Sequence, residues 1–83
     1  MDNDIVRVVF RVWLEDAAVF ALFPDLPADH SGNVTCYDHI DQHGAANYAH
    51  CITKSRPATV EEYTPLANEL RAIGYQLHIR QRR

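Results

Sequence analysis

The first long stretch of the chain carries an alternation that is typical of a β-strand. From Ile5 to Leu14, every second residue is apolar, and β-branched and aromatic types dominate the run. A second apolar run covers residues 18–23, and the short polar segment between the two runs suits a tight connection. The pattern predicts a β-hairpin over residues 5–23, closed by Pro24, which cannot donate a ladder hydrogen bond.

The middle of the chain carries weaker patterns. Turn-forming residues fill 24–33 and predict a surface loop. We expect a third strand over 34–40, a polar turn or short helical excursion over 41–47, and a fourth strand from Tyr48 to Lys54, where side chains alternate between two faces.

The strongest helix signal lies near the end of the chain. Thr59 and Glu62 have the spacing of a capping box, and apolar residues follow at helical intervals over 63–73. Gly74 is the residue type preferred just after a helix. Residues 75–80 alternate again and predict a final strand.

This order of elements, β-β-β-β-α-β, predicts a single α+β domain over residues 1–83. Its antiparallel-rich sheet has about five strands, and one helix packs on one face. At 83 residues and 47% hydrophobic, the chain has room for one core. The opposite sheet face carries Val9 and Trp13, so we expect a loop or another chain to cover it.

Several classes of protein are excluded by what the sequence lacks. Its longest apolar run has seven residues, where a membrane-spanning helix needs about 20. The first residues are acidic, unlike a secretory signal, and we expect a cytoplasmic protein with two reduced cysteines. Glycine-rich phosphate loops and metalloprotease motifs are absent from the sequence, so we expect no cofactor.

The net charge of −3 hides an uneven distribution. All eleven acidic residues lie in 1–70, whereas 71–83 hold four arginines and no acid. Carboxylates in loops and turns are free to meet a basic partner, and exposed aromatics often anchor interfaces. The candidate partner contacts are Trp13, Glu15, Asp16, Asp25, Asp29, Tyr37, Asp38 and Asp41.

A polar segment over residues 36–51 could carry chemistry. Cys36, His39 and His43, with His50 or Cys51 as a fourth ligand, offer nitrogen and sulfur donors for zinc. The same thiols, imidazoles and carboxylates are the components of a cysteine nucleophile with its base. Histidine and aspartate also serve simply to order a turn between strands, which is the interpretation we favour.

The terminal arginines offer a further alternative. Arg80, Arg82 and Arg83 could contact phosphates in a nucleic acid. Because no aromatic residues interleave with them on the same strand face, a base-stacking platform is not predicted. We therefore do not expect direct binding of nucleic acid.

Four short motifs resemble those of a family of short bacterial proteins of uncharacterised activity, carried on plasmids, prophages and other mobile elements. The motifs are Val8-Val9-Phe10-Arg11, Ala21-Leu22-Phe23-Pro24, His39-Ile40-Asp41-Gln42-His43-Gly44 and Ile73-Gly74-Tyr75-Gln76-Leu77. Asp41 replaces a glycine of the family pattern, and the hairpin turn over 15–17 also lacks the expected glycine. The resemblance implies an α+β fold and a mobile-element setting, but no reaction.

The leading hypothesis is a non-catalytic protein-binding module. In a mobile-element setting, its expected partner is a host protein or nucleoprotein complex, which it would inhibit as an anti-CRISPR-like counter-defence factor. A homodimer is also compatible with the sequence, and a membrane partner is not expected. The alternatives are a small metal-binding or thiol enzyme centred on 36–51 and a nucleic-acid-binding module.

Overall fold

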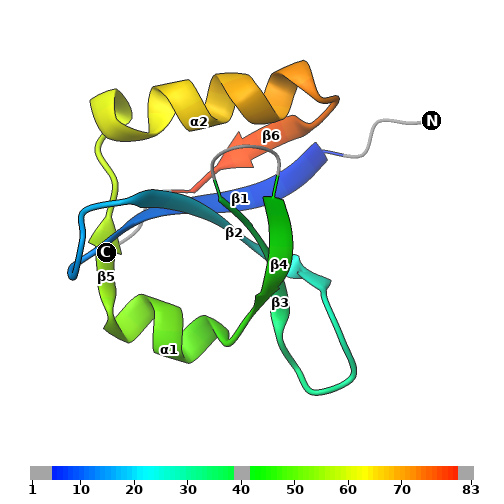
Figure 1. Cartoon of the computed structure of the whole chain (residues 1–83). Helices are drawn as coiled ribbons and strands as arrows, with labels where there is room; N and C mark the ends of the chain where they lie inside the picture. Colours follow the sequence, from blue (N-terminus) through cyan, green and yellow to red (C-terminus); the bar gives the residue numbers. More distant parts are fainter. Residues whose placement is uncertain (1–4, 39–41, 81–83) are drawn as a thin grey trace.

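The computed structural model describes residues 5–38 and 42–80, with Gln42 and His43 described by their backbone alone. Figure 1 shows six strands and two helices in this part of the chain. In chain order they are β1 (Ile5–Trp13), β2 (Val19–Pro27), β3 (Val34–Asp38), β4 (Gln42–Ala46), α1 (Tyr48–Thr53), β5 (Ser55–Pro57), α2 (Val60–Ala72) and β6 (Gln76–Ile79). The predicted α+β class and antiparallel-rich sheet are confirmed.

Strand β1 lies inside the sheet and pairs with three other strands. The order β4-β3-β2-β1-β5 is antiparallel throughout, and β6 pairs in parallel with the first half of β1. The Arg80 amide donates to the Val8 carbonyl, and the Ala58 amide donates to the Phe10 carbonyl. Because residues two apart in a strand direct their carbonyls to the same edge, β5 and β6 share one edge of β1.

The two helices cover opposite faces of the sheet (Figure 1). The main core lies under α2, where Leu66 and Leu70 pack against the even-numbered residues of β1. A smaller cluster lies on the other face, where Cys51 of α1 packs with Phe20 and Leu22 of β2. The predicted packing of one main helix on one face is confirmed for α2, and part of the second face is covered by the short helix α1 where a loop or another chain was expected.

Helix α2 begins and ends as the sequence predicts. The Thr59 amide donates to Glu62 Oε1 at 2.9 Å, and the Glu62 amide donates to Thr59 Oγ1 at 3.2 Å, which completes the capping box. Arg56 of β5 donates two further bonds to the Glu62 carboxylate, at 2.8 and 2.7 Å. These bonds, the Arg56 bonds above all, lower the pKa of Glu62 to about 2. Gly74, at φ 115°, follows the helix in a conformation that glycine adopts readily.

The segment from Tyr48 to Lys54 is a helix and not the predicted strand. The Asn47 side chain accepts a hydrogen bond from the His50 amide at 2.9 Å and caps α1. Six residues are too few for their periodicity to distinguish a helix from a strand. The Asn47 cap favours the helix.

Two boundaries in the sheet also differ from prediction. The expected turn over 41–47 contains β4, which forms a hairpin with β3. Strand β2 continues through Pro24 to Pro27, with a register shift between Phe23 and Pro27 that accommodates the proline. The three-residue strand β5 was not predicted, because so short a segment has no periodicity of its own.

Candidate functional site

The predicted acidic contacts fall at opposite ends of the sheet. Glu15 and Asp16 lie in the β1–β2 turn, and the pairing of β3 with β2 brings Asp38 to that same end. Asp25 and Asp29 lie at the far end of β2. Because the carboxylates do not form one face, an acidic surface can include only one of the two groups. Asp41 lies outside the described residues.

The two carboxylates at the far end of β2, Asp25 and Asp29, accept hydrogen bonds from nearby residues of the chain. Asp25 accepts from Arg7 Nη2 at 2.7 Å, an exposed ion pair. Asp29 accepts from the Asn33 side chain and from the Ser31 and Asn33 amides, so it orders its own loop. Its bond from the Asn33 side chain is the main reason that the pKa of Asp29 is lowered. These bonds make both groups weaker candidates for partner contact.

The carboxylates at the end of the sheet that holds the β1–β2 turn flank Trp13. Its ring stacks on Phe20, with centroids 4.2 Å apart and an interplanar angle of 13°. Hollows of about 520 and 300 Å³ share Trp13 and His50; Glu15 lines the first and Asp38 lines the second. Leu14, which also lines the first hollow, is 65% exposed. We define the Trp13 surface as Trp13, Leu14, Glu15, Asp38, His50 and Lys54; the last places one positive charge beside Glu15 in the first hollow.

The turn beside this surface holds a left-handed residue. Ala17 has φ 62°, at a position where a glycine would carry no Cβ penalty. The Asp16 side chain accepts from the Ala18 amide at 3.0 Å and supports the turn. The turn thus fixes the backbone that carries Glu15.

Tyr37 is removed from the candidate surface, and its predicted partner contact is wrong. The side chain is fully buried in the core under α2 and donates from its hydroxyl to Glu69 Oε2. Cys36, its neighbour in β3, packs on the α1 face, so strand alternation directs Tyr37 to the opposite face.

Four potentially reactive residues of the predicted chemical segment line the same hollow. They are Cys36, Asp38, His50 and Cys51. Burial is the main factor that raises the pKa of both thiols, with a smaller contribution from Asp38. Raised pKa values keep these thiols protonated near neutral pH, which opposes a nucleophilic role.

The proposed zinc ligands are only partly described. His39 and the side chain of His43 fall outside the described residues. Within residues 5–38 and 42–80, no group of three or more histidine, cysteine or acidic side chains is placed to hold a metal ion. The described candidates, Cys36, His50 and Cys51, line a common hollow.

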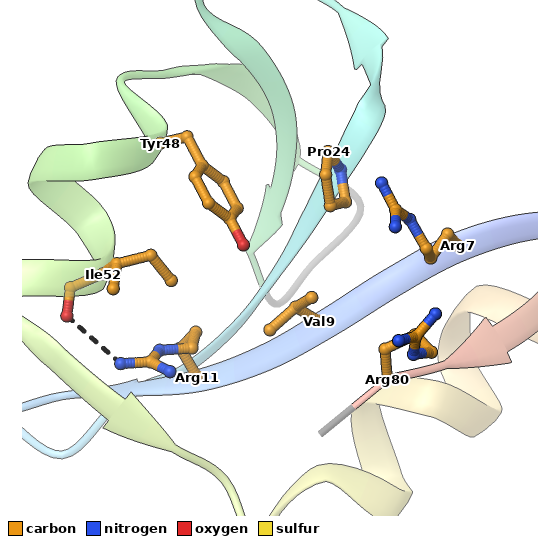
Figure 2. Close-up of a pocket in the computed structure, with 7 residues that line it drawn as sticks. All are labelled: Arg7, Val9, Arg11, Pro24, Tyr48, Ile52 and Arg80. Carbon is orange, nitrogen blue, oxygen red and sulfur yellow. Dashed lines mark hydrogen bonds between the residues drawn. The ribbon is translucent and has the colours of Figure 1, made fainter. Parts of the chain in front are cut away.

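Arg80 lies with two arginines that were not part of the prediction. Figure 2 shows Arg7, Arg11 and Arg80 around Val9, on the face that α1 covers. Alternation places Arg7 and Arg11 on one face of β1, but only the parallel pairing of β6 brings Arg80 there. The sequence signal for this arrangement is the i, i+4 spacing of Arg7 and Arg11, which places both on the same face of a strand. Arg82 and Arg83 lie outside the described residues.

Arg11 holds α1 and β5 against the sheet. It is 5% exposed and donates to Ser55 Oγ at 2.9 Å, to the Ser55 carbonyl at 2.8 Å and to the Ile52 carbonyl at 3.1 Å. Burial lowers the pKa of Arg11, and the nearby Tyr48 acts in the opposite direction. These bonds give the buried guanidinium neutral acceptors at the end of α1.

The described helices, of six and thirteen residues, are too short to cross a bilayer. No protein-family model, curated protein or solved structure matches this chain, so its function is inferred from its residues and their geometry.

Proposed function

We propose that this chain is a non-catalytic module that binds a basic protein through the Trp13 surface. The observation that carries the proposal is the position of Trp13 between hollows lined by Glu15 and Asp38. Protein interfaces draw much of their affinity from a few central aromatic anchors, surrounded by a polar rim.

The carboxylates of this surface are available to a partner. Among the described residues, neither Glu15 nor Asp38 forms an ion pair. Unpaired carboxylates attract a positively charged partner over several ångströms and increase the association rate at low salt. Leu14 adds an exposed apolar side chain that binding would bury.

The resemblance to mobile-element proteins favours a host target. A basic surface that holds nucleic acid in a host machine would complement these carboxylates, and occupying it would inhibit that machine. This role is an anti-CRISPR-like counter-defence factor, and it requires that the chain compete with nucleic acid for its partner.

The test uses the tagged chain to capture proteins from a bacterial host lysate at low and moderate salt. We expect a basic protein that is retained by the wild type and released by added nucleic acid. Charge reversal at Asp38 (Asp38→Lys) and replacement of the aromatic anchor (Trp13→Leu) should both abolish its capture.

Asp25→Lys is the matched control, because it changes the net charge equally at the opposite end of the sheet. Circular dichroism of each variant establishes that it is folded. Suppose that both variants are folded and that Asp38→Lys retains the captured protein as well as Asp25→Lys does. This result would refute the Trp13 surface as the binding site.

A further inference from the structure

A third hollow, of about 360 Å³, lies on the α1 face of the sheet, and three arginines contribute to its lining. Arg7 and Arg11 flank Val9 along β1 at roughly 6.6 Å on either side, from the rise of a strand. In the β1–β6 register, Val8 pairs with Ile79, so Arg80 follows beside Val9. Figure 2 shows the three side chains around this valine.

The charge of these arginines is incompletely balanced. Among the described residues, Asp25 is the one carboxylate paired with them, through Arg7. Arg11 donates to neutral oxygens, and no described residue accepts from the Arg80 guanidinium. Counting residues 5–38 and 42–80 alone, the hollow therefore has a surplus of two positive charges.

One buried donor in this group also lacks an acceptor. The Nε of Arg7 is inaccessible to solvent, and no described residue accepts its hydrogen bond. A buried donor without a partner is unfavourable, but because solvent cannot reach this atom, a ligand oxygen could accept from it only if the Arg7 side chain moved.

The opposite side of the hollow is apolar and carries one hydroxyl. Tyr48 and Ile52 descend from α1, and Pro24 lies across from them on β2. In Figure 2 the Tyr48 hydroxyl points from α1 toward Val9, between Arg11 and the other two arginines. A ligand here would meet cationic donors on one side and a flat, largely apolar surface on the other.

We propose that this hollow binds a phosphate-bearing small molecule of the nucleotide class. Its phosphate would lie between Arg7 and Arg80, whose planar guanidinium groups suit phosphate oxygens. Its ring would lie against Tyr48 and Ile52, and Arg11 would contribute charge while keeping its structural bonds.

The size of the hollow favours a mononucleotide over a strand. Pockets for single small ligands begin at about 300 Å³, whereas a strand requires a groove that continues along its backbone with successive stacking aromatics. Here the three arginines converge on one hollow, and among the described residues that line it Tyr48 is the one aromatic side chain.

Isothermal titration calorimetry of the full chain with AMP, pyrophosphate and adenosine tests the proposal. We expect AMP to bind, pyrophosphate to bind more weakly and uncharged adenosine not to bind. Arg80→Gln should weaken AMP binding about tenfold or more, because it removes a charged donor that has no described structural partner. Tyr48→Ala should reduce AMP affinity more than pyrophosphate affinity.

Arg71→Gln is the matched control, since it removes the same charge from α2 on the other face of the sheet. It should leave AMP affinity within about twofold of wild type. Absence of AMP binding at millimolar concentration, or equal losses in Arg80→Gln and Arg71→Gln, would overturn the proposal. A labelled thymidine oligonucleotide that binds in an Arg80-dependent way, while AMP does not, would overturn it in favour of a strand.

Discussion

Replacing Arg11 with methionine tests whether a buried cation stabilises this small domain. Methionine keeps an unbranched side chain on β1 but removes the three donated hydrogen bonds. The carbonyls of Ile52 and Ser55 then lose their bonds from the guanidinium, which are 3.1 and 2.8 Å long. Ile52 lies in the last turn of α1, and Ser55 is the first residue of β5.

The expected loss in the free energy of unfolding is about 2–4 kcal/mol. Each acceptor left without a partner costs about 1–3 kcal/mol, and removing a desolvated charge returns part of that sum. A chain of 83 residues has a total stability of roughly 4–12 kcal/mol, so the loss would be a large fraction. The melting temperature should fall by roughly 10–25 °C.

Urea unfolding followed by circular dichroism and Trp13 fluorescence measures this loss. Arg7→Met is the control, because it makes the same substitution on the same face of β1 where the arginine side chain is 42% exposed. It should cost less than about 1 kcal/mol, as for other surface ion pairs. If Arg11→Met were as stable as wild type, the three bonds would not outweigh the cost of burying the charge, and our reasoning would be refuted.

Three further predictions concern the turn, the helix cap and the thiols. Ala17→Gly should raise the free energy of unfolding by about 0.5–1 kcal/mol, because glycine has no Cβ to strain the left-handed backbone at this position. The control, Ala18→Gly, should not raise it. Equal effects of the two substitutions in thermal melts would contradict this. Glu62 has a folded pKa of about 2 against an ordinary 4.5, so the stability it contributes is present above pH 4.5 and lost as the pH falls toward 2. Acid titration of Glu62→Gln should show a smaller loss over that window, and an unchanged profile would count against the ion pair. Cys36 and Cys51 should react with iodoacetamide at pH 8 more slowly in the folded chain than in urea, because burial raises both pKa values; faster labelling when folded would instead indicate an activated thiol.

Local signals predicted the parts of the fold that depend on neighbours in sequence. Thr59, Glu62 and Gly74 define α2 because capping and left-handed termination act within a few residues. Helix α1 was missed because its six residues alternate as a strand would, and the capping signal of Asn47 was not used. A short segment takes its structure from its caps and its packing more than from its periodicity.

The candidate sites were less predictable, because they depend on pairing between distant segments. The register of β3 on β2 brings Asp38 to the same end of the sheet as Glu15, and the pairing of β6 with β1 brings Arg80 to the hollow that Arg7 lines. Neither register can be read from a single strand. Tyr37 was predicted to be exposed because the sequence does not distinguish a buried tyrosine, whose hydroxyl has an acceptor, from an exposed one.

The position of β6 on the edge of β1 has a consequence for synthesis on the ribosome. Ile5 pairs with Gln76, so the first strand cannot complete its pairing until the ribosome has made the chain through β6. At about 5–20 residues per second, β1 waits for several seconds with an apolar edge unpaired. A chain that stops before β6 would therefore expose the unpaired edge of β1. Such an edge promotes aggregation and is recognised by chaperones and proteases.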